Sequence, residues 1–255
     1  VSTVAPDAAS KLSAVQVSRM SFGSASLTDA MSAAALAVPL TPLYQFPGFR
    51  IGARPNYPEE FWQNTPSVRY DLQVNRPEIV LADGGRSVAW PTTRISVARI
   101  PLATRDVVLV HGIEPSMRWR SFTTELLTVA RDLGVEMVVT LGALLADTPH
   151  TRPVPVSGTS SDSDLALKLG YEPSSYEGPT GIVGVLQDAC AAAGIPAVSL
   201  WAAVPHYVAQ PPCPKATLAL LARIEDLLDV PVPLGDLPDE ARAWQIGVDE
   251  LAGED

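Results

Sequence analysis

The sequence predicts an α/β domain with a mostly parallel central sheet, and three successive segments lead to this fold class. Residues 106–110 form a continuous β-branched run, which is typical of a strand buried on both faces. Residues 118–133 follow with helical spacing of apolar positions, and residues 135–141 form a second apolar run. A strand, a helix and a second strand with short connections are the unit from which right-handed crossovers build parallel sheets.

Further elements are expected on both sides of this unit. Two runs, 79–81 and 87–90, flank an Asp-Gly-Gly turn at 83–85 and predict a hairpin, and residues 95–98 predict an edge strand. A long loop is expected over 142–160 because it carries Pro149, Pro153 and Pro155. The remaining predictions are helices over 162–169, 180–193, 215–228 and 237–251, and a strand over 197–203.

The first part of the chain has a different composition. Residues 1–66 are rich in Ser, Ala and Pro, carry few charges and show no sustained period of 2 or 3.6 residues. We expect little independent structure there, apart from a short Ala-rich helix over 27–38. With 255 residues and 47% hydrophobic content, the chain can bury one substantial core, which we place in a domain spanning residues 67–255.

Charge and cysteine content exclude several classes of partner. The net charge is −10, from 28 acidic and 18 basic residues, and such a field repels nucleic acid and anionic membranes. Cys190 and Cys213 lack CxxC spacing, so neither a disulfide scaffold nor a zinc knuckle is expected. The apolar stretch 33–40 is far shorter than the roughly 20 residues that span a bilayer, and Asp29 interrupts any signal-peptide core. We expect a cytoplasmic protein.

Three histidines are the first candidates for acid–base or metal chemistry. His111 ends a predicted strand, His150 lies in the long loop, and His206 follows another strand. Because the carboxyl ends of parallel strands share one edge of a sheet, the three could be neighbours, with Glu114 and Asp147 on the same rim. The spacings lie in predicted loops and lack the helical register of HExxH, so structural histidines are favoured over a catalytic or metal site.

Recognised catalytic and cofactor motifs are missing from the sequence. Residues 108–112 are similar to the strand and His-Gly turn of α/β-hydrolases, but the chain has no G-x-S-x-G pentapeptide. It has neither a Walker A sequence nor G-x-G-x-x-G, so no cofactor is predicted.

Thr180 and Gly181 begin a predicted helix, whose free N–H groups could hold an anion. One of Arg76, Arg94, Arg118 and Arg152 would have to supply a second positive group. A plain turn and helix cap is the favoured interpretation. Pro205-His206-Tyr207 makes a rigid, aromatic segment that suits either a protein contact or a packed loop.

Several longer motifs carry a family resemblance. They are DLQVNRP at 71–77, WPTTR at 90–94, GIEPSMRWR at 112–120, GALLADTPHTRP at 142–153 and YEGPTG at 176–181. In this order they resemble the actinobacterial branch of the proteasome-assembly-chaperone family. The resemblance implies a three-layer α/β/α domain similar to nucleoside phosphorylases and related hydrolases, homo-oligomers, and binding to α-type proteasome subunits. It supplies no catalytic set, so no catalytic residue is carried over.

Two departures from the family are visible. Members usually begin with a strand and a Gly-Trp-Asn-Asp-Ala-Gly-like turn into a first helix, and residues 1–68 lack this pattern. A shifted reading frame or a divergent start is our hypothesis for that segment. Archaeal relatives dock through a C-terminal tail of a hydrophobic residue, Tyr and any residue, whereas this chain ends Leu-Ala-Gly-Glu-Asp.

The leading hypothesis is a non-enzymatic, self-associating assembly factor that uses residues 142–160 and 205–214 as its contact surface. The alternative is a small-molecule-binding protein or enzyme of the phosphorylase or hydrolase type, with a pocket at the carboxyl edge of the sheet. The candidate pocket or interface residues are Asn75, Arg76, His111, Glu114, Arg118, Asp147, His150, Arg152, Thr180, Gly181, His206 and Tyr207.

Overall fold

The computed structural model describes residues 11–19, 40–45, 70–82, 84–98, 105–171, 176–209 and 212–253. The helix expected over residues 27–38 lies outside these ranges, as does the side chain of His111, whose backbone alone is described.

Seven strands form one mixed sheet in the order β2-β5-β6-β1-β7-β9-β8. Its four inner strands, β6, β1, β7 and β9, run parallel. β5 pairs antiparallel with β6, β8 pairs antiparallel with β9, and β2 pairs antiparallel with β5. The predicted α/β fold with a mostly parallel, mixed sheet is therefore confirmed. The strand bounds are β1 (Lys11–Arg19), β2 (Leu40–Gln45), β5 (Thr93–Ala98), β6 (Arg105–Ile113), β7 (Val135–Ala146), β8 (Val156–Ser160) and β9 (Ala197–Pro205).

Two of these strands come from the segment for which the sequence predicted little structure. β1 lies in the middle of the sheet, where Val17 pairs with His111 on one side and Leu141 on the other. β2 pairs with β5, so the predicted edge strand at 95–98 has a neighbour on both sides. The expectation for residues 1–66 is corrected for these two stretches.

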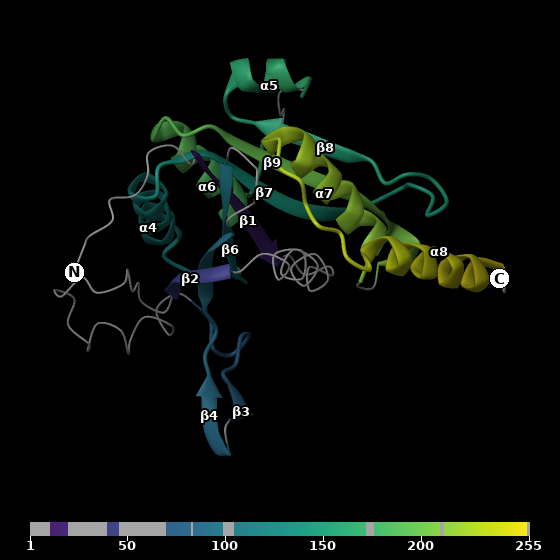
Figure 1. Cartoon of the computed structure of the whole chain (residues 1–255), viewed down its shortest axis with the longest axis horizontal. Coiled ribbons are helices and arrows are strands. Elements are labelled where there is room, and N and C mark those ends of the chain that lie inside the picture. Colours follow the sequence, from purple (N-terminus) through teal and green to yellow (C-terminus); the bar gives the residue numbers. More distant parts are fainter. Residues whose placement is uncertain are drawn as a thin grey trace, which may run out of the picture.

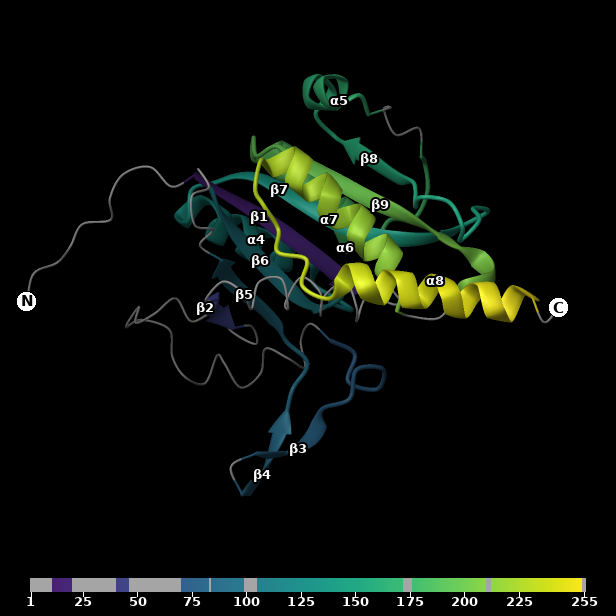
Figure 2. The same cartoon turned by 45° about the vertical axis from the view of Figure 1, so that its right-hand side comes forward.

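Helices cover both faces of the sheet and give three layers (Figures 1 and 2). α4 (Trp119–Asp132) and α6 (Ile182–Ala192) bury one core with Val108, Val110 and Val138. α7 (Pro214–Leu228) and α8 (Leu237–Gly253) bury the other core, in which Leu220 and Leu221 of α7 are 1% and 0% exposed. The burial of each such leucine side chain stabilises the folded protein by about 1.5–3 kcal/mol.

Local signals in the sequence fix the helix ends. The carboxylate of Asp162 accepts the N–H groups of Asp164 and Leu165 at 2.9 and 3.0 Å, which starts α5 (Ser163–Leu169), and Gly170 ends it at φ 68°. Pro214 occupies the first turn of α7, where its missing N–H costs nothing.

The predicted loop over 142–160 is shorter in the structure than the sequence indicates. β7 continues to Ala146 because β9 runs beside it as far as Pro205. β8 pairs with the other side of β9, from Val156↔Ala202 to Ser160↔Val198. Only residues 147–155 remain outside these two strands.

The predicted hairpin is present as a separate two-stranded sheet. It consists of β3 (Glu78–Ala82) and β4 (Gly85–Ala89), and Gly84 in the turn has φ 76°. The hairpin projects away from the seven-stranded sheet in both views (Figures 1 and 2).

Candidate functional site

His150 sits where the 147–155 loop meets the C-terminal helix, and its side chain is only 9% exposed. Nδ1 of the ring lies 2.8 Å from the Tyr207 hydroxyl, which follows β9 in the short 3-10 helix η1 (His206–Val208). Nε2 lies 2.7 Å from Oδ1 of Asp249 on α8. One buried imidazole therefore links the loop, η1 and α8.

The hydrogen-bond pattern assigns the protons of this chain. The peptide N–H of His150 donates to the Tyr207 hydroxyl oxygen at 2.8 Å. In the neutral imidazole, the Tyr207 O–H then donates to Nδ1, and Nε2–H donates to the Asp249 carboxylate. Every polar group of the ring is satisfied, as a buried imidazole requires.

Lys215 at the start of α7 also binds the backbone of this loop. Its ammonium group donates to the carbonyl oxygen of His150, to that of Arg152 at 3.1 Å, and to Oε1 of Gln245 on α8 at 2.8 Å. An ammonium group has three N–H donors, so all of them are engaged. The loop backbone is therefore held by Lys215 of α7, whose ammonium group is in turn held by Gln245 of α8.

The outer side of this loop is exposed. Asp147, Arg152 and His206 are exposed, and Tyr207 is 51% exposed. The rings of His206 and Tyr207 meet edge to face with centroids 5.5 Å apart. We call Asp147, Arg152, His206 and Tyr207 the loop surface.

Glu114 occupies the helix start that the sequence marked as an anion-site candidate. Its Oε1 accepts the N–H of Ile182 at 3.2 Å, one residue after the N-cap Gly181. A carboxylate at the positive end of a helix is favourable, and it would repel a second anion there. The cap interpretation of Thr180 and Gly181 is therefore the one that the geometry supports.

Three other candidates lie near the base of the hairpin or at the start of α4. Asn75 closes a turn by donating its N–H to the Asp71 carbonyl at 2.8 Å, and Arg76 is exposed beside it. The Asp71 N–H donates to the hydroxyl of Ser116 at 2.9 Å. Arg118 is the N-cap of α4 with φ 58°, and its side chain is exposed.

The strand register separates His111 from the other two histidines. His111 and Leu141 both pair with Val17, and β7 continues five residues beyond Leu141 before the loop that holds His150 begins. At about 3.3 Å per residue, these five residues place the backbone of His111 roughly 17 Å, along the strand direction, from the start of that loop. Within the described residues, no group of three His, Cys, Asp or Glu side chains could hold a metal ion.

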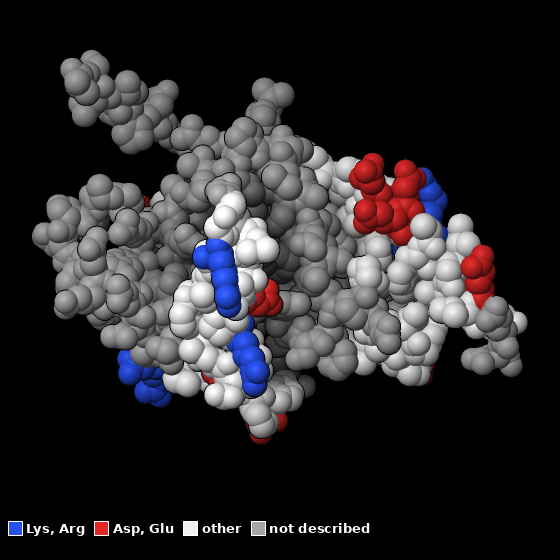
Figure 3. All heavy atoms as spheres, turned by 90° about the horizontal axis from the view of Figure 1, so that it is seen from below, with Lys and Arg blue, Asp and Glu red and all other residues white. Residues whose placement is uncertain are grey.

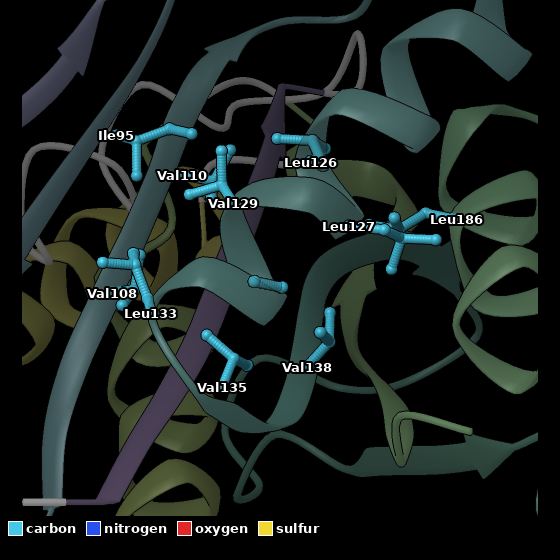
Figure 4. A pocket seen from close by; sticks show the side chains of 11 residues that line it. Ile95, Val108, Val110, Leu126, Leu127, Val129, Leu133, Val135, Val138 and Leu186 are labelled. Atoms are coloured by element: carbon cyan, nitrogen blue, oxygen red, sulfur yellow. The ribbon is translucent and has the colours of Figure 1, made fainter. Parts of the chain in front are cut away.

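A small cavity lies on the opposite face of the sheet from His150. It measures about 30 Å³ and lies between α4 and the sheet, with Val108, Leu126, Val138 and Leu186 among its lining residues (Figure 4). The lining is entirely aliphatic, and a space of this size has room for about one water molecule. It is a packing void without polar groups to orient a substrate, and it contains none of the predicted pocket residues.

Comparison with known proteins assigns the family. The sequence model of the PAC2 family matches residues 64–252. The chain belongs to the PAC2 family. The proteasome-assembly-chaperone resemblance of the sequence motifs is thereby confirmed.

Solved structures support the same assignment. A PAC2 family protein from Streptomyces avermitilis is 54% identical, with 94% of this chain and 96% of that chain covered and a TM-score of 0.79. A proteasome-assembly chaperone homologue from Mycobacterium tuberculosis is 46% identical, with 96% of both chains covered and a TM-score of 0.79. An archaeal proteasome activator from Pyrococcus furiosus, at 12% identity and a TM-score of 0.66 over 98% of this chain and 96% of that chain, shares the fold. No curated protein matches the chain.

The described helices of this PAC2 protein include none that is long and apolar enough to cross a bilayer.

The site also contains residues that sequence reasoning did not single out, namely Lys215, Gln245 and Asp249. Lys215 had one local signal, its place in the first turn of a predicted helix just after the Pro-rich segment. Gln245 and Asp249 lie on α8, whose polar positions are typical of a solvated helix face.

Proposed function

We propose that this PAC2 protein is a non-enzymatic assembly chaperone that binds α-type proteasome subunits and associates with itself. Family membership supports the proposal, together with the similarity to the Mycobacterium tuberculosis proteasome-assembly chaperone homologue. The proposal places the protein in the cytoplasm, where its two thiols remain reduced.

The observation that carries the proposal is that hydrogen bonds hold the backbone of the loop surface in place. Tyr207 and Lys215 fix the backbone of the 147–155 loop through hydrogen bonds at His150 and Arg152. A surface that is ordered before binding loses less conformational entropy when a partner docks.

The composition of the loop surface also suits a protein partner. Tyr and Arg are enriched among the residues that dominate binding energy, and Tyr207 and Arg152 are both exposed here. Asp147 supplies a charge of opposite sign, which would fix the orientation of the partner rather than its affinity.

The test is binding to immobilised recombinant α-type subunits. Arg152→Glu should weaken binding about tenfold or more because it reverses a charge at the contact while leaving the loop carbonyls in place. Arg131→Glu is the matched control, since Arg131 is an exposed arginine on α4 at the opposite face of the sheet. Tyr207→Phe should reduce binding more modestly, because it keeps the ring but removes the hydroxyl that holds His150.

Two results would contradict the proposal. One is recovery of no α-type subunit above background with the wild-type protein. The other is a thermal shift with a nucleoside, phosphate or divalent metal, because a ligand at 100 times its dissociation constant adds about 2.7 kcal/mol to the free energy of unfolding.

A further inference from the structure

Asp249, His150 and Tyr207 form one hydrogen-bonded line that runs from a carboxylate through an imidazole to a phenol. Oδ1 of Asp249 lies 2.7 Å from Nε2 of His150, and Nδ1 of the same ring lies 2.8 Å from the Tyr207 hydroxyl. A hydroxyl group beside a base, with the base oriented by a third group, is the arrangement that activates nucleophiles in enzymes. The order of the groups is that of a catalytic triad with a phenol in place of the serine.

The imidazole of His150 is in the state that a base requires. Because Nε2–H donates to the Asp249 carboxylate, Nδ1 carries a lone pair and accepts the Tyr207 O–H. The His150 side chain is only 9% exposed, so the phenol rather than bulk water is the neighbour of Nδ1. The Tyr207 proton therefore has an acceptor already in place.

The Tyr207 side chain is open to solvent, with 51% of its surface exposed. Its oxygen accepts the peptide N–H of His150 at 2.8 Å. A fixed N–H donor of this kind stabilises negative charge as it develops on an oxygen. A hydroxyl oxygen has two lone pairs, so one remains after this bond and can attack an electrophile.

We propose that Tyr207 is a modification site that takes the acyl group of a small activated carboxylic acid derivative, such as an aryl ester or an acyl phosphate. The Tyr207 oxygen attacks the carbonyl carbon, its O–H bond breaks, and Nδ1 of His150 takes the proton. The bond between the carbonyl carbon and the leaving group then breaks, the leaving group keeps the bonding electrons, and the imidazolium returns the proton to it or to water. The inference concerns a modification site and not a turnover cycle, and it does not depend on proteasome binding.

The charges around His150 favour the imidazolium that forms in this step. Asp249 contacts the ring itself, whereas the Lys215 ammonium group contacts the peptide carbonyl oxygen of His150. The carboxylate is therefore the charge that acts most directly on the ring. Acidic side chains, among them Asp239 and Glu240, also gather over α8, the helix that carries Asp249 (Figure 3).

Tyr176 provides a comparison within the same chain. It is 68% exposed, so access alone would favour modification of Tyr176 over Tyr207. The Tyr176 hydroxyl donates its proton to the carbonyl oxygen of Pro179 at 2.7 Å, and a peptide carbonyl is too weak a base to take that proton. Faster modification of Tyr207 would therefore measure activation rather than access.

The first test is acetylation of the full chain by para-nitrophenyl acetate and, separately, by acetyl phosphate, followed by peptide mapping with mass spectrometry. Hydroxylamine identifies the product, because it removes an acetyl group from a tyrosine ester and leaves the amide of an acetylated lysine intact. Tyr207 should be acetylated about tenfold or more faster than Tyr176, as expected for general-base assistance. This comparison is made within the wild-type protein and does not depend on how a variant folds.

The second test removes the base and its orienting carboxylate in turn. His150→Gln should lower the acetylation rate of Tyr207 about tenfold or more. Asp249→Asn also should slow it about tenfold or more, because the charge that stabilises the imidazolium is lost. Glu250→Gln is the matched control, since it removes an exposed charge from the next position of α8 and should leave the rate unchanged.

A solvent isotope effect separates proton transfer from a structural role of these residues. Replacing water by D2O should slow acetylation of Tyr207 in the wild type and in Asp249→Asn, because a proton moves to Nδ1 as the carbonyl carbon is attacked. The slowing should disappear in His150→Gln. If His150 only held the loop, its substitution would lower the rate and leave the isotope effect in place.

Equal acetylation of Tyr207 and Tyr176, an unchanged rate in His150→Gln, or an isotope effect that survives this substitution would overturn the inference. A protein that is acetylated at Tyr207 and binds no α-type subunit would contradict only the chaperone proposal. A protein that binds α-type subunits while its Tyr207 is no more reactive than Tyr176 would contradict only the modification site.

Discussion

Cys190 shows how burial of a single residue makes stability depend on pH. It lies on α6 with 0% of its surface exposed, and burial raises the pKa of its thiol from 9.0 to about 11. Between these two values the folded protein keeps the proton while the unfolded chain loses it. Ionisation then stabilises the unfolded state, so the free energy of unfolding should fall by about 2–3 kcal/mol from pH 9 to pH 11.

Urea unfolding of the wild type and of Cys190→Ala at a series of pH values measures this contribution. Other groups also titrate in this range, so the informative quantity is the difference between the two proteins. It should be constant below pH 9 and should shrink towards pH 11. A difference that does not change with pH would show that the thiol does not titrate in this window.

At the residue scale, the sequence predicted the members of the site better than their contacts. His150, His206 and Tyr207 were singled out, and the structure brings them together around the Tyr207 ring. Asp249 is 99 residues from His150 and has no local signal, because an acid near the end of a helix is typical of a solvated face. His111 was grouped with the others only because strand ends share an edge, and the extra length of β7 separates it from them.

At the element scale, Gly112 of β6 lies against the start of β5, where it pairs with Thr93. A Cβ atom there would lie 2.7 Å from the carbonyl oxygen of Thr92 and from the Cα of Thr93, both backbone atoms that cannot rotate away. Gly112→Ala should therefore destabilise the fold by about 1–3 kcal/mol, the usual cost of overpacking.

Gly247→Ala is the control for the Gly112 substitution. Gly247 lies inside α8, and apart from its chain neighbours and the nearby helix backbone no described atom lies within 4 Å of the position that an alanine Cβ would take. Alanine should therefore raise the free energy of unfolding by about 0.5–1 kcal/mol. Urea denaturation of both variants measures the two effects. Equal effects of the same sign would contradict the close approach at Gly112.

The sequence predicted those helices and strands that can be recognised from their own pattern of apolar residues. The apolar run before His111 and the amphipathic pattern of α4 need no partner to be recognised. The sequences of β1 (KLSAVQVSR) and β8 (VSGTS) contain few apolar residues, and they become strands because a neighbouring strand offers an edge. Such tertiary context overrides local propensity and cannot be recovered from a short window of sequence.

At the scale of the whole molecule, the hairpin and the seven-stranded sheet should contribute very differently to stability. Glu78 pairs with Ala89, so a two-residue Asn-Gly turn can replace residues 79–88 without moving the ends. The side chains removed are largely exposed, and little buried apolar surface is lost. The replacement should change the free energy of unfolding, measured by urea denaturation, by about 1 kcal/mol or less.

The edge strand β8 is the matched comparison, because it also has five residues but belongs to the main sheet. Val156 packs against the core on the α7 side, and β8 pairs with β9 along its whole length. Replacing Val156–Ser160 by Gly and Ser residues should therefore cost about 2 kcal/mol or more, since it removes a packed valine and weakens every cross-strand pair. If the hairpin replacement proved as costly as the β8 replacement, the hairpin would be part of the folded core, and the contrast expected from its exposure would be wrong.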